Sequence, residues 1–162
     1  MSSLRVRSVL VTAILTMSAL ASAQSSGMGR VVLRDGRSAT TRLPPNALRV
    51  TSRDVSEASC RSCVGRHTTY ELHATFPRGP VESVEIVADV VGARRAFTIG
   101  SGPYPARSDV RVRMRGATED VSLGGTLAFE TARSPLSTRV TYTARAPTSP
   151  VRSMLFDVRR SE

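Results

Sequence analysis

The stretch that decides the fold is Tyr70–Val91, which reads YELHATF, then PRGP, then VESVEIVADVV. Apolar and polar side chains alternate from 70 to 76 and again from 84 to 90, a period typical of half-buried strands. Pro77 and Pro80 interrupt the pattern around Gly79, because proline fixes φ and lacks an N–H donor while glycine tolerates φ > 0. Two strands joined by such a corner predict the central hairpin of an antiparallel sheet.

The first 23 residues have the three parts of a secretory signal peptide. Arg5 and Arg7 precede an apolar run over 9–20, and Ala21-Ser22-Ala23 supplies the small residues that a signal peptidase reads. We therefore predict cleavage after Ala23 and a secreted or periplasmic protein. An uncleaved anchor helix is the alternative, but the run is shorter than the roughly 20 residues that span a bilayer.

Short strand patterns separated by turn residues fill the rest of the chain. They cover 30–34, 38–43, 47–52, 96–99, 109–115, 121–131, 139–145 and 151–159. Regular short strands at this spacing predict an all-β fold, an antiparallel β-sandwich of immunoglobulin-like or jelly-roll layout, with a closed barrel as the alternative. We expect a flexible leader over 24–29 and a single sandwich domain over 30–162.

Two local signals refine this prediction. Asp35-Gly36 is typical of a two-residue hairpin turn between the first two strands. The segment 54–65 is the one helix expected in the mature chain, because Asp54 and Glu57 fit a capping box and Gly65 fits a helix C-terminus.

Arginine dominates the charge of the chain, which contains no lysine and has a formal net charge of +10. Without Arg5 and Arg7, 21 of the 23 arginines remain against 13 acidic residues, so the mature chain carries +8. A positive field of this size favours anionic partners. The simpler interpretation is a solvated surface, in which a GC-rich genome uses arginine where others use lysine. This composition and the signal peptide together favour a bacterial source.

Cys60 and Cys63 are the only cysteines, and in an oxidising compartment they predict a local disulfide bond. A redox-active pair and a zinc site with His67 and His73 are the alternatives. Six residues of strand would separate the two histidines by about 20 Å, which argues against one shared ion. We therefore expect no metal site, and we interpret both histidines as surface side chains on the polar face of a strand.

The best candidate for a binding surface is an anion-binding row formed by Arg111, Arg113 and Arg115, with Arg107 nearby. Alternate residues of a strand stand about 7 Å apart, a spacing that suits successive anionic groups of a polymer. The interpretation that we favour is an ordinary solvated face, paired across the sheet with Glu85 and Asp89.

Sequence motifs of catalysis are missing: there is no nucleophile elbow, zincin motif, P-loop or dinucleotide fingerprint. We therefore expect a non-enzymatic protein without cofactors that has a structural or protein-interaction role in the cell envelope. A binder of anionic envelope polymer, polysaccharide or lipopolysaccharide, is the first alternative, and a thiol-dependent enzyme is the second. Nucleic acid is not an expected partner, since Tyr104 is the one aromatic residue near the arginine row.

Overall fold

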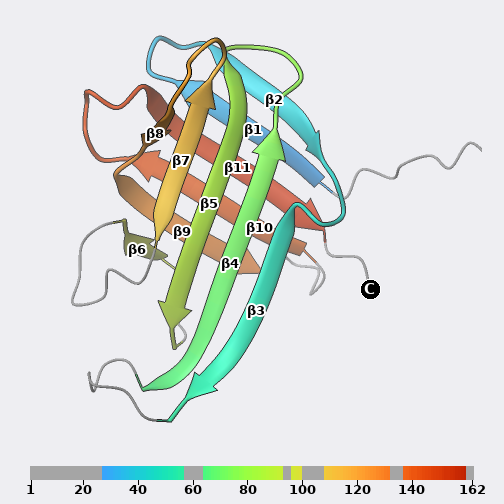
Figure 1. The fold of residues 1–162 in the computed structure, drawn as a ribbon, viewed down its shortest axis with the longest axis vertical. Coiled ribbons are helices and arrows are strands. Elements are labelled where there is room, and N and C mark those ends of the chain that lie inside the picture. Colours follow the sequence, from blue (N-terminus) through green and yellow to red (C-terminus); the bar gives the residue numbers. More distant parts are fainter. Residues whose placement is uncertain (1–26, 57–63, 93–95, 100–107, 132–136, 160–162) are drawn as a thin grey trace, which may run out of the picture.

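The computed structural model describes residues 27–56, 64–92, 96–99, 108–131 and 137–159, and all regular elements in these ranges are β-strands (Figure 1). The strands are β1 (Gly27–Leu33), β2 (Ser38–Leu43), β3 (Leu48–Val55), β4 (Gly65–Thr75), β5 (Val81–Val91), β6 (Ala96–Thr98), β7 (Asp109–Met114), β8 (Asp120–Ser122), β9 (Gly125–Thr131), β10 (Ser137–Ala144) and β11 (Val151–Arg159).

These strands form two antiparallel sheets that pack face to face. One has six strands in the order β2-β1-β11-β10-β9-β6, and the other has five in the order β3-β4-β5-β7-β8. The arrangement confirms the predicted β-sandwich. Within the described ranges, no helix is long and apolar enough to cross a bilayer. The predicted signal peptide lies outside the described residues.

The central hairpin is β4 and β5, as the pattern over 70–91 predicted. Leu72 pairs with Ile86, and both are buried in the core. The corner begins where the N–H of Phe76 donates to the carbonyl of Glu82 at 2.8 Å. Gly79 within it has φ of 93°, a conformation that side chains with a Cβ rarely adopt.

The turn between β1 and β2 has three residues, Arg34 to Gly36, instead of the predicted two. The N–H of Leu33 donates to the carbonyl of Arg37 at 2.8 Å, and the N–H of Gly36 donates to the carbonyl of Leu33 at 3.2 Å. Gly36 has φ of 86°. This is the geometry of a type I turn followed by a bulge, the next commonest solution after the two-residue turns.

The predicted helix over 54–65 is wrong at both of its ends. Asp54 lies in β3, where it faces Arg66 across the ladder, and Gly65 begins β4. The ladder between β3 and β4 continues through this position to Val55 and Gly65, so tertiary pairing overrides the local capping signal. The middle of the segment lies outside the described residues.

One hydrophobic core fills the space between the sheets. Its largest fully buried side chains include Tyr142 and Phe156 from one sheet and Leu72 and Ile86 from the other. The ring of Tyr70 stacks on that of Phe129 with centroids 4.0 Å apart, and so ties β4 to β9 across the core. At about 25 cal/mol per Å² of buried apolar area, this layer supplies most of the driving force for folding.

The strands β2 and β3 position the candidate site. They follow each other in sequence, but β2 is the edge strand of one sheet and β3 is the edge strand of the other. Pro44 and Pro45 lie in the connection that takes the chain from one sheet to the other. Proline has no N–H to donate, so it cannot contribute all the hydrogen bonds of a ladder residue to either sheet. Both edges therefore lie on the same side of the sandwich, on the right in Figure 1.

Candidate functional site

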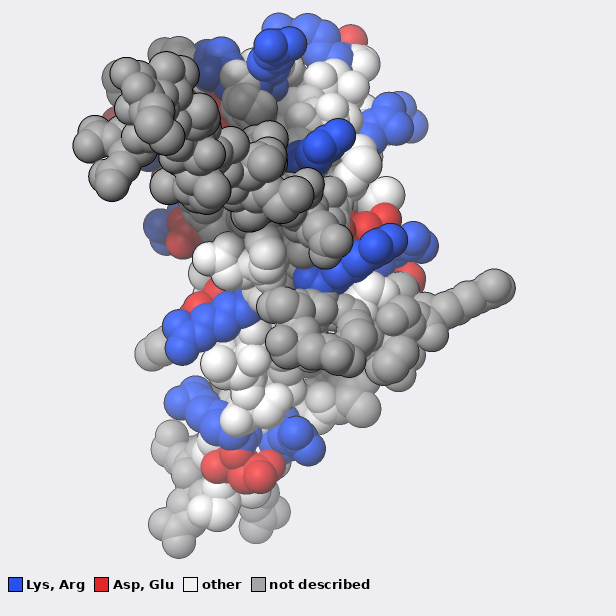
Figure 2. Space-filling model, turned by 90° about the vertical axis from the view of Figure 1, so that its right-hand side faces the viewer, with Lys and Arg blue, Asp and Glu red and all other residues white. Residues whose placement is uncertain are grey.

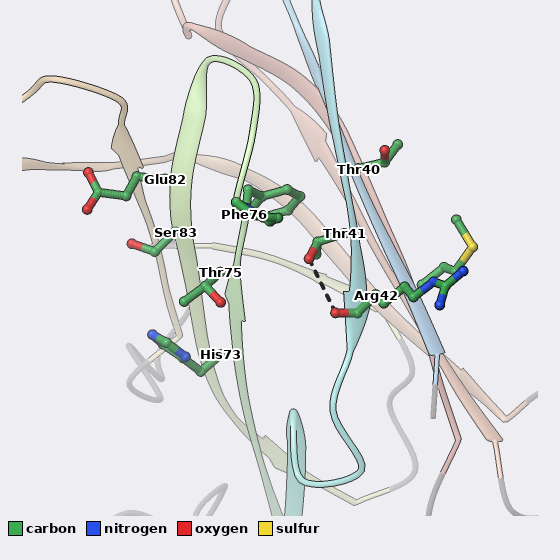
Figure 3. A pocket seen from close by; sticks show the side chains of 10 residues that line it. Thr40, Thr41, Arg42, His73, Thr75, Phe76, Glu82 and Ser83 are labelled. Atoms are coloured by element: carbon green, nitrogen blue, oxygen red, sulfur yellow. Dashed lines mark hydrogen bonds between the residues drawn. The ribbon is translucent and has the colours of Figure 1, made fainter. Parts of the chain in front are cut away.

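A groove of about 960 Å³ opens between β2 and the corner that joins β4 to β5 (Figure 3). We call it the β2 groove. It is lined by Met28, Thr40, Thr41, Arg42, His73, Thr75, Phe76, Pro77, Glu82 and Ser83. One wall thus comes from the first sheet and the other from the second, so the groove lies on the open side of the sandwich.

Two close approaches bound the β2 groove along its length. At one end the corner touches β2, since a Cβ added to Gly79 would lie 3.3 Å from the Cβ of Ala39. At the other end the N–H of His73 donates to the carbonyl of Ala47 at 2.9 Å. Between these points β2 diverges from β4, and the gap between the two walls is the groove (Figure 3).

The backbone of β2 offers hydrogen-bonding groups on its free edge. Because Leu33 and Arg37 form a hydrogen-bonded pair, the alternation of an antiparallel ladder makes Ala39 and Thr41 the next residues that bond to β1. The N–H and C=O groups of the residues between them, Ser38, Thr40 and Arg42, therefore point away from β1.

The hydroxyl of Thr41 donates to the carbonyl of Arg42 at 3.2 Å, shown as a dashed line in Figure 3. Within the described residues, β2 pairs with β1 alone. A segment in extended conformation could therefore add to this edge and complete the hydrogen bonds of its backbone.

The side chains around the β2 groove combine an apolar floor with a polar rim. Phe76 is 2% exposed and forms part of the floor. Arg42 and Glu82 are exposed on opposite walls, and neither makes an ion pair within the described part of the chain. Hydroxyls of threonine and serine and the imidazole of His73 supply the remaining polar groups. The arrangement suits binding of a mixed apolar and polar segment.

The predicted arginine row does not form a uniform cationic surface among the residues that the structure describes. Arg111 donates to Asp109 at 2.6 Å and Arg113 donates to Asp120 at 2.7 Å. These hydrogen bonds raise the pKa of both guanidinium groups, and the two carboxylates offset their positive charge. Arg107 lies outside the described residues.

Arg115 has a different position from the one that the alternation predicted. The strand β7 ends at Met114, and the guanidinium of Arg115 turns to the β4–β5 corner. Its Nε donates to the carbonyl of Gly79 at 2.8 Å, and its terminal nitrogen donates to the carbonyls of Phe76 and Val81. Arg115 thus holds a wall of the β2 groove and is not part of a flat arginine row.

The expected cross-strand partners of the arginine row are separated in the structure. Glu85 is opposite Arg111 in the ladder, as predicted. Asp89 lies instead beside His67, whose Nδ1 is 3.3 Å from the Asp89 carboxylate. The hydroxyl of Thr69 donates to the same carboxylate at 3.3 Å.

The prediction for His67 is wrong, because this side chain is only 5% exposed. His73 is exposed, as predicted, and lines the β2 groove. Among the described residues, no three His, Cys, Asp or Glu side chains come together as a metal site. Cys60 and Cys63, and with them the predicted disulfide bond, lie outside the described ranges.

Sequence reasoning missed the β2 groove. Its signal was present in two proline-containing breaks, Pro44-Pro45 and Pro77 to Pro80, which end β2 and shape the opposite wall. Nothing in a local pattern, however, says that the two breaks meet across the sandwich.

No family model, curated protein or solved structure matches this chain.

Proposed function

We propose that this protein is an exported, non-enzymatic interaction module of the cell envelope, which binds an extended segment of a partner protein along β2. The observation that carries the proposal is the free edge of β2 beside a groove with its own apolar floor. The edge supplies backbone hydrogen bonds for affinity, and the groove supplies side-chain contacts for specificity. Export rests on the signal peptide predicted from residues 1–23.

The alternative of an anionic polymer bound by the arginine row is less well supported. Arg111 and Arg113 each carry their own carboxylate partner, and a polymer would have to displace it. Displacing an existing ion pair returns little free energy, since one charge-assisted hydrogen bond replaces another. A segment bound along β2 would displace no ion pair of the described residues. At Arg42 it would compete only with the neutral hydroxyl of Thr41 for the backbone carbonyl.

The test uses peptides selected from a displayed library of random heptapeptides against the mature protein. Their affinity is then measured for the Thr40→Pro variant, in which proline removes an N–H that points to the free edge and leaves the ladder with β1 intact. Ser122→Pro is the matched control, because the same ladder argument places the N–H of Ser122 on the free edge of β8. Circular dichroism and thermal unfolding verify that both variants fold.

We expect Thr40→Pro to lower the affinity for the selected peptides by about ten-fold, which is the equivalent of one or two backbone hydrogen bonds. Ser122→Pro should leave their affinity unchanged. Peptides that bind wild type and Thr40→Pro equally would contradict the proposal. Binding that is lost with Arg111→Ala and Arg113→Ala instead would favour the anion-binding alternative.

A further inference from the structure

The second edge on the open side, β3, also has backbone groups that no described strand uses. The N–H of His73 bonds to the carbonyl of Ala47, so the odd-numbered residues of β3 bond to β4. The N–H and C=O groups of the even-numbered residues therefore point outward; these are Leu48, Val50, Ser52 and Asp54.

The second half of β3 extends past the core. Residues 51–54 are all exposed, including Ser52 and Asp54, whose side chains share the inward face with the buried Leu48. Figure 1 shows the lower ends of β3 and β4 reaching beyond the strands of the other sheet. Among the described elements, therefore, no second layer limits the side chains of a strand added here.

Arginines flank this edge on its outer face. Arg53 is 67% exposed and has one long contact, 3.7 Å, with Asp89. Arg49 is exposed and makes no ion pair within the described ranges. Figure 2 shows this side of the molecule, with arginine side chains (blue) along its whole length.

The same arginines disfavour pairing with a second copy of the chain. In the antiparallel register that overlaps 48–54 completely, Arg49 of each copy would stand opposite Arg53 of the other. Like charges directly opposite in a ladder are destabilising, and charged side chains on an edge are a common protection against self-association. The free edge of β3 therefore disfavours pairing with the same edge of a second copy and favours an added strand of opposite charge.

We infer that β3 binds an extended, acidic segment of a protein partner as an added antiparallel strand. Side chains opposite Arg49 and Arg53 are four residues apart on the added strand and lie on the same face. The segment would therefore carry two acidic residues with three residues between them, and the middle one would face Thr51. This site is separate from the β2 groove and does not depend on the function proposed for it.

The test uses the synthetic peptide acetyl-TEVTVET-amide, whose glutamates fall opposite the two arginines. A lysine version, acetyl-TKVTVKT-amide, and a version with proline at the first valine are the control peptides. That valine would lie opposite Ser52, so its N–H is one of those that would bond to β3. Affinity is measured by isothermal calorimetry, and the exchange rates of the Val50 and Ser52 amide protons are measured by NMR. Sedimentation of the free protein reports self-association.

Three variants separate the contributions of backbone and charge. Ser52→Pro removes one outward N–H, and the double variant Arg49→Glu, Arg53→Glu reverses the charge. The double variant Arg111→Glu, Arg113→Glu makes the same charge change elsewhere on the same sheet. We expect the first two variants to bind the acidic peptide at least about ten-fold more weakly than wild type. The third variant should bind it with unchanged affinity. Charge reversal at 49 and 53 should also create affinity for the lysine peptide.

Several results would overturn the inference. Binding that survives Ser52→Pro, or that the proline-containing peptide shares, would mean charge attraction without strand addition. Dimers of wild type that Ser52→Pro abolishes would mean that β3 pairs with itself. Loss of the acidic peptide with Thr40→Pro would place it in the β2 groove, which would support the proposed function and contradict this second site.

Discussion

Replacing Arg115 by alanine should destabilise the protein, although the sequence alone assigns this residue to a binding surface. The side chain donates hydrogen bonds to three carbonyls of the β4–β5 corner, those of Phe76, Gly79 and Val81. A hydrogen bond from a charged donor contributes about 1.5–3 kcal/mol. The corner is partly exposed, so water can replace much of each bond, and the three bonds together should contribute about 2 kcal/mol.

Urea unfolding monitored by circular dichroism measures this loss directly. For a domain of this size, about 2 kcal/mol corresponds to a fall in Tm of roughly 8 °C. Arg115→Lys should recover part of the loss, because an ammonium donates from one point and cannot reach all three carbonyls. The matched control is Arg113→Ala, which removes an exposed ion pair with Asp120 and should stay within experimental error of wild type.

The reasoning would be refuted if Arg115→Ala unfolded at the wild-type urea concentration, or if Arg113→Ala cost as much as Arg115→Ala. A second readout follows from the position of the corner as a wall of the β2 groove. Arg115→Ala should also weaken peptides selected for this groove, whereas Arg113→Ala should not.

Three further predictions concern the packing and the charges of the fold. Gly125→Ala should destabilise by about 1–3 kcal/mol, measured by urea unfolding, because the added Cβ would lie 2.3 Å from the carbonyl oxygen of Thr143. Phe156→Ala should cost about 3–5 kcal/mol in the same assay, since the side chain is completely buried and leaves a cavity; a smaller loss would mean a loosely packed core. Asp35 has a lowered pKa because it accepts hydrogen bonds from the backbone and then from the side chain of Arg37. Its contribution to stability is therefore present above its unfolded pKa and is lost as the pH falls through the folded pKa. Asp35→Asn should be less stable than wild type at neutral pH and should approach it in acid; a difference independent of pH would contradict this.

The strands were predictable because their signal is local. Alternation places Val84, Ile86, Ala88 and Val90 on one face of β5, and all four are buried in the core. The stretch 121–131 divides into the end of β8 and the whole of β9, with Leu123 and Gly124 between the two strands. Period-two alternation survives folding because each residue of a strand keeps its face whatever the strand pairs with.

The errors share a different cause, namely contacts between residues distant in sequence. Asp54 fits a helix cap by its neighbours alone, but β4 is available as a partner and takes it into a ladder. His67 is on the polar face by its parity, and it is nonetheless buried beside Asp89 of the next strand. Arg115 continues the alternation of β7, but that strand has already ended and the β4–β5 corner is within reach.

The β2 groove was beyond sequence reasoning for the same reason. Its two walls come from different sheets, and its width depends on how closely Gly79 approaches Ala39. The sequence predicts an interaction role in general terms and indicates no particular strand edge for it. Which edges are free depends on the order of strands in the two sheets, and that order is a property of the whole fold.

The most direct test of the account is amide hydrogen exchange along β2, measured by NMR with and without a peptide selected for the β2 groove. In the free protein, the amides of Ser38, Thr40 and Arg42 should exchange rapidly, while those of Ala39 and Thr41 should be protected by β1. The bound peptide should slow exchange at Thr40 and Arg42 and leave Ala39 and Thr41 protected as before. Rapid exchange at Thr40 and Arg42 in the complex, or protection of both in the free protein, would contradict capture of an extended segment by this edge.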